Sequence, residues 1–538
     1  MSRFDRPGTP VMINVPVCII GCGPIGLAGA LLLSRFGIDT LLIERRGEVN
    51  SHPRSRFVDT NTMELMRFLG LEKAVEETGL GPDWTAYNRW FNALTGDQIA
   101  AIPSPTFHTV PRSTSPTMPV MTCQDYVENV LLAEAWDDER IELRYRTEAV
   151  EINQDEQGAT VVIRNLTSGR KSTVSADYLL GTDGPHSFVR QAIGSALEAA
   201  PLDNYAQDVI FEADLSEYVE GRKGGLLYNA TPSGVLVFQP LNGITRWRCQ
   251  IFKADGEPLS EAETISRIRE AVGGGDVPIR ITSTGIWRPT PGCVDRLSRG
   301  RVFLAGDAAH ISVPTGGMGN NIGFAGIRNL AWKLAYVLKG LAPAWILDTY
   351  HTEHRPVALD RVATGVETTA FMRKIFLAYY SGEDPSEGVR ETRQYADYDG
   401  VLLGFELESP LIAKNAELPP AVDNATIDFV PAVRAGRRAP HVWVDERQSQ
   451  SILDWFGTEY VLVGGASVAA ERWRNTVGRV ADGAGFPVRW EQLPLRVAAP
   501  YDPRGLALIR PDGIIADCWD DGEVRDDDVA ARLRRQLP

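Results

Sequence analysis

The chain has 538 residues, 43% of them hydrophobic and 23% charged, a composition typical of a globular protein with roughly two to four domains. Its 70 acidic and 55 basic side chains give a net charge of −15, which argues against nucleic acid or an anionic membrane as a partner. No apolar run approaches the ~18 residues that span a bilayer, the start does not resemble a signal peptide, and the six cysteines lack metal-ligand spacing, so we expect a cytoplasmic protein without a metal site.

The first predicted element is a nucleotide-binding βαβ unit over residues 15–45. An apolar strand precedes the run Gly21-Cys22-Gly23-Pro24-Ile25-Gly26, an apolar helix follows it, and the next strand ends in Glu44. In this pattern the first glycine permits a tight turn, the second lets the backbone approach a pyrophosphate, and the third lets helix and strand pack closely. The helix N-terminus attracts the phosphates, and Glu44 is placed to accept hydrogen bonds from a ribose. The motif predicts a dinucleotide site but does not distinguish FAD from NAD(P).

The next 240 residues or so predict a change from helices to strands. Helices are expected at 60–80 and 124–138, with an irregular stretch rich in Pro, Ser and Thr at 84–120. Strand-like alternation follows over 141–180 and most of 206–285. Side chains that face a ligand are expected from 206–285 and from loops around 84–120, although core packing explains most of the alternating residues Leu226, Tyr228, Leu236 and Phe238.

Two further motifs follow predicted strands. Asp183 lies in Gly181-Thr182-Asp183-Gly184-Pro185-His186-Ser187. The longer motif begins Gly306-Asp307-Ala308-Ala309-His310 after a strand at 301–305, and continues from Pro314 to Asn321 into a helix expected at about 320–339.

The chemistry of the longer motif suits a flat ring bound to ribitol. An aspartate at a strand end can bond a ribitol or ribose hydroxyl, and a glycine-rich turn lets the ring lie against backbone. The helix start stabilises negative charge, as on the N1–C2=O edge of reduced flavin. Pro314 is predicted to line the flavin face, and for His310 the favoured interpretation is a structural hydrogen bond behind the flavin.

The last hundred residues predict a separate α/β domain. After a polar, Pro-containing stretch at 382–440, the pattern runs strand (460–463), helix (469–481), strand, strand and helix. No second Gly-x-Gly-x-x-Gly with a strand and an acid around it is found in the chain, so only one nucleotide has a dedicated fold.

The three motifs, in this order, resemble the single-component FAD-dependent aromatic hydroxylases, the class A flavoprotein monooxygenases, and in particular the phenol, dichlorophenol and aromatic polyketide hydroxylases. Pro53-Arg54-Ser55, Gln124 and the segments 329–334 and 347–355 match the family further. Asn61 and Gly326 depart from it, since many members have Arg and Asp there.

This resemblance implies an α/β fold with a para-hydroxybenzoate-hydroxylase-like FAD domain. That domain is expected over 1–190 and 285–400, with a β-sheet substrate domain at 191–284 between its parts. A linker at 401–440 leads to a thioredoxin-like domain at 441–538, which has no C-x-x-C and is therefore expected to serve packing or oligomerisation.

The resemblance also implies the reaction. FAD is the resident cofactor, NAD(P)H is a transient co-substrate, and O2 yields a flavin C4a-hydroperoxide that hydroxylates an electron-rich aromatic ring. The residues implied to bind FAD are Gly21, Gly23, Pro24, Ile25, Gly26, Glu44, Arg45, Arg54, Gln124, Asp183, Asp307, Pro314, Gly317, Met318, Gly319, Asn320 and Asn321.

Three polar side chains are candidates to orient or deprotonate a phenol: Tyr228, Gln239 and Arg248. For each, a structural hydrogen bond is favoured over a catalytic role. The lack of an arginine cluster in 206–285 favours a neutral, apolar substrate over an aromatic acid. Baeyer–Villiger oxidation or epoxidation of a polyketide is the alternative reaction, and a non-oxygenating flavin-binding protein is a weaker one. The substrate, the choice of NADPH or NADH, and the formation of a homo-oligomer stay open.

Overall fold

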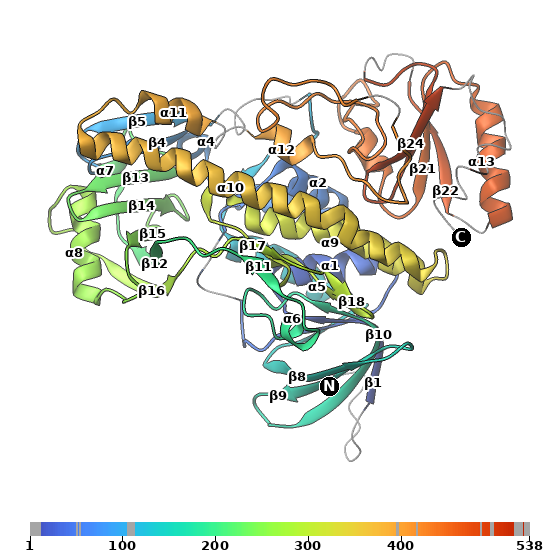
Figure 1. Cartoon of the computed structure of the whole chain (residues 1–538), viewed down its shortest axis with the longest axis horizontal. Helices are drawn as coiled ribbons and strands as arrows, with labels where there is room; N and C mark the ends of the chain where they lie inside the picture. Colours follow the sequence, from blue (N-terminus) through green and yellow to red (C-terminus); the bar gives the residue numbers. More distant parts are fainter. Residues whose placement is uncertain are drawn as a thin grey trace.

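The structure is a computed structural model that describes residues 12–49, 52, 55–104, 113–393, 398–415, 418–484, 487–494, 500–520 and 531. Figure 1 shows two sheets joined by a long helix, α10 (Thr349–Ser381), with a third sheet at the C-terminal side. Among the described residues, no helix combines the length and the apolar character needed to cross a membrane.

The first sheet brings the three predicted motifs to one edge. Its strands run β18-β19-β10-β1-β2-β7, with β9 and β8 added beside β10. Strand β1 pairs in parallel with β10 and β2, so that Ile20 lies opposite both Gly181 and Ile43, and Gly181 lies opposite Leu304. Parallel strands that end in register place the turns that follow them side by side. The bounds are β1 (Met12–Ile20), β2 (Thr40–Ile43), β7 (Ile141–Arg144), β8 (Thr147–Gln154), β9 (Ala159–Asn165), β10 (Lys171–Gly181), β18 (Ser298–Arg299) and β19 (Val302–Leu304).

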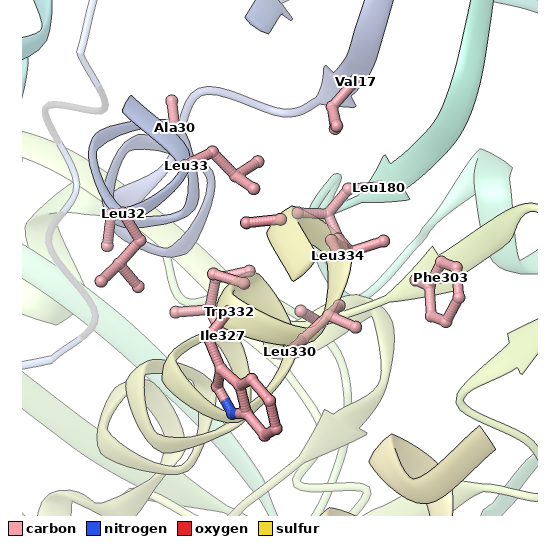
Figure 2. Close-up of a cluster of buried hydrophobic side chains, with 14 of the residues drawn as sticks. Val17, Ala30, Leu32, Leu33, Leu180, Phe303, Ile327, Leu330, Trp332 and Leu334 are labelled. Carbon is pink, nitrogen blue, oxygen red and sulfur yellow. The ribbon is translucent and has the colours of Figure 1, made fainter. Parts of the chain in front are cut away.

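Two apolar helices pack together on this sheet. Helix α9 (Met318–Leu338) confirms the predicted helix at 320–339, and it lies against α1 (Pro24–Arg35). Figure 2 shows Leu33 and Leu334 in one buried cluster with Leu180 of β10. The two helices are in close contact because α1 carries Gly29. A Cβ added at this position would lie 3.1 Å from the Ile327 side chain.

The second sheet is antiparallel apart from one pair, and it corrects the prediction for 84–120. Its order is β16-β12-β15-β14-β13-β4-β5. Strands β4 (Tyr87–Phe91) and β5 (Gln98–Pro103) lie inside the stretch predicted to be irregular, and β4 pairs in parallel with β13. In Figure 1 these blue strands lie beside the green ones. The other bounds are β12 (Tyr205–Glu212), β13 (Leu226–Thr231), β14 (Gly234–Pro240), β15 (Arg246–Lys253) and β16 (Arg280–Trp287).

This second sheet has two different faces. One face packs mainly apolar side chains on α8 (Glu261–Val272), with the buried Gln207 among them. The other face turns toward α10, whose Met372 and Ile375 pack with Trp90 and Tyr228 of the sheet. The space left between this face and α10 is the cavity described below.

Shorter elements connect these parts. They are β3 (Phe57–Val58), α2 (Thr60–Leu69), α3 (Glu72–Glu76), α4 (Pro82–Thr85), β6 (Val120–Met121), α5 (Gln124–Asp137), α6 (Phe188–Ala192), β11 (Leu197–Ala199), α7 (Ser216–Val219), β17 (Gly292–Val294), η2 (Gly306–Ala308), β20 (His310–Ile311), η3 (Thr315–Gly317), η4 (Ala344–Asp348), α11 (Ser386–Thr392), α12 (Asp399–Leu403) and η6 (Ile452–Trp455).

The C-terminal region is an α/β unit, as predicted. Its sheet order is β22-β21-β23-β24, with a parallel β21–β22 pair joined through α13. The predicted last helix lies outside the described residues except for residue 531. The exact domain boundaries stay a prediction. The bounds are β21 (Tyr460–Gly464), α13 (Ala470–Ala484), β22 (Val488–Gln492), β23 (Gly505–Ile509) and β24 (Ile515–Asp520).

Candidate active site

The turn from Gly21 to Gly26, here called the fingerprint turn, is the predicted site of a bound pyrophosphate. Gly21 has a φ of +110°, and a Cβ there would lie 2.4 Å from the Thr182 carbonyl oxygen. A Cβ on Gly26 would lie 2.0 Å from the Gly21 oxygen. Gly23, in contrast, has nothing within 4 Å of its Cβ position. Two glycines are therefore required by packing, and Gly23 leaves open space at the N-terminus of α1, where phosphates bind well. Pro24 and Ile25 are buried in the first turn of that helix.

Glu44 lies directly after β2, beside this turn. Its Oε2 accepts a hydrogen bond from the Cys22 N–H at 3.0 Å, and its Oε1 accepts one from the Arg46 N–H at 2.8 Å. Each carboxylate oxygen can accept a second bond, so ribose hydroxyls can still be bound. Arg45, next in the chain, is exposed.

The two motif aspartates, Asp183 and Asp307, follow the ends of the neighbouring strands β10 and β19 of the first sheet. The Asp183 carboxylate accepts from the Ser187 hydroxyl and from the Val189 N–H at 3.1 Å, and thereby holds the start of α6. Burial raises the pKa of this carboxyl above its usual value. Asp307 is half-buried in η2, immediately after β19.

The loop at residues 314–319, which is predicted to lie along the flavin and is called the flavin loop below, has backbone angles that favour glycine. Gly316 and Gly317 have φ values of +81° and +61°, and a Cβ on Gly317 would lie 2.8 Å from the Phe57 Cβ. A Cβ on Gly319 would meet nothing closer than 3.9 Å. Helix α9 begins at Met318, so the N–H groups of its first turn, which includes Asn320, are available to a ligand.

Asn321 has a role that the motif did not suggest. Its Oδ1 accepts from the Asp59 N–H at 3.1 Å and from the Thr62 hydroxyl at 2.8 Å. Its Nδ2 donates to the Phe57 oxygen at 3.0 Å and to the Gly317 oxygen at 2.8 Å. The side chain thus joins the flavin loop to β3 and α2, and a bound cofactor would be left with the Asn321 backbone.

Gln124 connects α5 to the segment that follows Arg54, which itself lies outside the described residues. The Gln124 Oε1 accepts from the Ser55 N–H at 3.3 Å, and its Nε2 donates to Glu128 at 2.6 Å. Burial raises the pKa of Glu128 to about 7.

One cavity of about 760 Å³ joins the flavin loop to the second sheet. Pro314, Thr315, Gly316 and Gly317 line it from the loop. Helix α10 covers it with a row of side chains at helical spacing. All four residues predicted to position substrate or flavin line this cavity: Tyr228, Gln239, Arg248 and Pro314.

A buried ion pair forms part of the polar wall of the cavity. The Arg248 Nε and Nη2 donate to the two carboxylate oxygens of Asp208 at 2.8 and 2.6 Å. Trp287 Nε1 donates to the same carboxylate at 3.0 Å. The charge of Arg248 is therefore neutralised by Asp208. The cavity is also lined by Arg56, which donates to the backbone oxygens of Pro240 and Gly225, and by Arg373.

Another part of the cavity wall is aromatic and apolar. Tyr228 stacks on Trp90, with ring centroids 4.7 Å apart, and meets Phe376 of α10 edge-on. Its hydroxyl donates to the Met372 sulfur at 3.8 Å. Tyr228 thus serves as a wall of the cavity.

His310 corrects a prediction. Its ring is fully buried, and neither ring nitrogen has a hydrogen-bond partner among the described residues, so the expected structural hydrogen bond is wrong. Burial lowers the pKa of His310 to about 4, so the ring is neutral at pH 7. It meets His354 of α10 edge-on at 5.7 Å.

Two features of the site were missed by the sequence analysis. The Tyr398 hydroxyl donates to the Gly316 oxygen at 2.6 Å, and its ring packs edge-on against Phe57. Helix α10 supplies Met372, Phe376 and Tyr380, and this i, i+4, i+8 spacing was the signal that could have revealed it.

The fold, the fingerprint turn and the flavin loop define a flavin-dependent enzyme. Comparison with known proteins gives its family. A family model described as an FAD binding domain matches residues 14–364, and a model of the aromatic-ring hydroxylase C-terminal region matches residues 432–537. The chain therefore belongs to the FAD-dependent aromatic-ring hydroxylases, and it is an FAD-dependent monooxygenase.

Individual relatives match over nearly the whole chain. The sequence is 32% identical to a 4-methyl-5-nitrocatechol 5-monooxygenase of a Burkholderia species, over 97% of both chains. The structure is similar to that of the flavin-dependent monooxygenase PieE in complex with FAD and substrate, with a TM-score of 0.87, 29% identity, and coverage of 97% of this chain and 99% of that one. It is also similar to aklavinone-11 hydroxylase in a ternary complex with FAD and aklavinone, with a TM-score of 0.84, 28% identity and the same coverage. The predicted family, fold class and cofactor are confirmed, whereas the individual contacts with FAD stay predictions.

Proposed function

We propose that the protein uses NAD(P)H and O2 to hydroxylate a neutral, electron-rich aromatic ring system with more than one ring. The observation that carries this proposal is the cavity shared by the flavin loop and the aromatic wall of the second sheet. Its volume of about 760 Å³, which the flavin ring and the substrate would share, lies within the range of roughly 300–1,000 Å³ typical of ligand pockets. A phenol with several fused rings, or an aromatic polyketide, fits this space better than a single ring.

The residues of the chain would hold and shield the reactants. FAD, when bound, supplies the redox chemistry by accepting a hydride and activating oxygen. Gly23 and the first turns of α1 and α9 would bind its phosphates and ring edge through backbone N–H groups. The walls formed by Tyr228, Met372 and Phe376 would exclude water and hold the substrate ring near the loop at Pro314–Gly317.

The polar candidates support orientation of the substrate more than proton removal. Arg248 is bound to Asp208, and Gln239 donates to Gln250 at 3.1 Å. Tyr228 donates to a methionine sulfur. Each side chain already has a partner that fixes it in the wall, so the phenol proton is not assigned to any of them.

An anaerobic experiment tests this function. The purified protein should retain a flavin, and its reduction by NADPH or NADH should accelerate when a bicyclic or tricyclic phenol is present, more than with phenol itself. After oxygen is admitted, mass spectrometry should find a ring-hydroxylated product and no lactone or epoxide. A protein that neither retains nor binds FAD, or whose reduction responds to phenol alone, would contradict the proposal.

A further inference from the structure

A hydrogen-bond donor without an acceptor is buried in the wall of the cavity. Gln250 of β15 is 3% exposed and lines the cavity. Its Nε2 makes no hydrogen bond to any side chain or backbone group of the described residues. Because leaving a buried donor unpaired costs free energy, such a group needs an explanation. The contents of the cavity are the source from which an acceptor can come.

A chain of neighbouring side chains fixes which end of the Gln250 amide is free. Arg248 is held by Asp208, and its guanidinium can only donate. Its Nη1 donates to the Gln239 Oε1 at 3.4 Å, which turns the Gln239 Nε2 toward the next residue. That Nε2 donates to the Gln250 Oε1 at 3.1 Å. The buried ion pair therefore orients both amides, and the chain ends on a donor.

The pairing of the strands keeps these groups together. Gln239 lies opposite Arg248 in the β14–β15 pair, and Asp208 lies opposite Gln250 in the β12–β15 pair. The next positions on the same face, Val237 and Phe252, are apolar. The face thus offers one neutral donor at the border of an apolar surface.

We propose that Gln250 is a specificity-determining residue that donates from Nε2 to an oxygen of the substrate. This inference rests on the proposed function and names the feature of the substrate that the site recognises: a phenol, phenolate or carbonyl oxygen on the ring system. A site built to donate to an oxygen rejects the analogue that lacks it, because the donor is then left unpaired. The rings extend from this oxygen over Val237 and Phe252.

Binding measurements on the purified protein test this. Equilibrium dialysis, which needs no flavin signal, gives the Kd of 2-naphthol, 1,4-naphthoquinone and naphthalene. The wild type should bind each oxygenated probe about tenfold more tightly than naphthalene, which is the order expected for one neutral hydrogen bond. Gln250→Met should reduce that preference to about one, with naphthalene binding unchanged.

Gln207→Met is the matched control. Gln207 is buried in the same sheet, but its Nε2 lies near Thr264 and its Oε1 accepts from the Leu259 N–H, away from the cavity. Thermal melts should show that it perturbs folding at least as much as Gln250→Met, while the preference for oxygen is kept. If Gln250→Met does not fold, Gln250→Leu also removes the donor without introducing a titratable group, and should abolish the preference in the same way.

Two results would overturn the inference. One is a wild type that binds neither oxygenated probe better than naphthalene. The other is a Gln250 variant that keeps the preference, which would mean that water satisfies the donor. Failure of the proposed function is seen separately, as a protein that binds no FAD or whose flavin is not reduced by NAD(P)H.

Discussion

Single residues in the fingerprint turn divide into two kinds, those required by packing and those that leave room for a ligand. Gly23→Ala places a methyl group in open space, whereas Gly26→Ala places one 2.0 Å from the Gly21 oxygen. We expect Gly23→Ala to fold with a thermal midpoint close to that of the wild type, since no contact is made. FAD binding by this variant should weaken by at least about tenfold, because the methyl group occupies the space of the pyrophosphate.

Gly26→Ala provides the contrast. The clash is with backbone, so this variant should be poorly soluble or melt well below the wild type even without FAD. Fluorescence titration with FAD and apoprotein melting curves measure both effects. Equal FAD affinity in Gly23→Ala and the wild type would contradict the assignment of that space to the cofactor.

Glu128 gives a prediction for pH. Burial raises the pKa of its carboxyl from 4.5 to about 7. A raised carboxyl pKa means that ionisation opposes folding, so the destabilisation is absent below about pH 4.5 and is fully present above about pH 7. The free energy of unfolding of Glu128→Gln, measured relative to that of the wild type, should therefore rise by about 1–3 kcal/mol as the pH is raised from 5 to 8.

Glu134→Gln is the control for this series, because Glu134 lies on the same helix with 41% of its side chain exposed. The difference in free energy of unfolding between Glu134→Gln and the wild type, measured in the same denaturant titrations, is the baseline for comparison. A difference for Glu128→Gln that does not depart from this baseline would show that Glu128 has an ordinary pKa.

The single-residue predictions from sequence were best where one local turn decides the role. The spacing of Gly21, Gly23 and Gly26 was sufficient to predict the tight turn and the close packing, because the turn is built from residues near one another in the chain. Gln250 could not be found in this way, since its free donor depends on Arg248 and Asp208 across two strand pairs. The expected hydrogen bond of His310 failed for the same reason, because helix α10 supplies its neighbour His354.

Whole elements were predicted when their pattern was local and strong. Helix α9 has Ile327, Leu330 and Leu334 fully buried at helical spacing, and its bounds agree with the prediction within two residues. Strands β4 and β5 were missed because β4 is completed by β13, more than a hundred residues later in the chain. Helix α10 was missed as well. Its Pro356 is typical of a helix start or end, yet it lies inside the helix.

The covering helix α10 carries the prediction at the element scale. Phe376 packs edge-on against Tyr228 and closes the apolar side of the cavity. Phe376→Ala should admit water to the reacting centre, so that several-fold more hydrogen peroxide is released per NAD(P)H oxidised. Oxygen uptake with and without catalase measures this coupling. Leu359→Ala, on the same helix but away from this cavity, should leave coupling unchanged. Tight coupling in Phe376→Ala would show that α10 does not shield the reaction.

At the scale of the whole molecule, a buried network ties the C-terminal sheet to the FAD-binding part. Glu353 of α10 accepts from Lys333 of α9 at 2.8 Å and from Arg510 at 2.7 and 2.9 Å. Arg510 also pairs with Asp512, and Trp332 donates to Asp512 at 3.1 Å. The two cations hold the pKa of Glu353 well below its usual range. The sequence predicted a role in packing or oligomerisation for the tail, but not this network, because its members lie up to 180 residues apart.

Removing one partner from this network should separate the C-terminal unit from the rest. Arg510→Met leaves Glu353 and Asp512 buried with one cation fewer, and such a loss typically costs about 3–5 kcal/mol. We expect a lower thermal midpoint and faster proteolytic release of a C-terminal fragment. Arg67→Ala removes a partly exposed ion pair with Asp454 between the same two parts and should cost no more than about 1 kcal/mol.

Because the pKa of Glu353 is lowered, the stabilisation by the network is present above the ordinary pKa of this carboxyl and is lost as the pH falls further. The gap between Arg510→Met and the wild type should therefore narrow in acid, and a gap that is small at pH 7 would mean that the C-terminal sheet is held mainly by its apolar contacts.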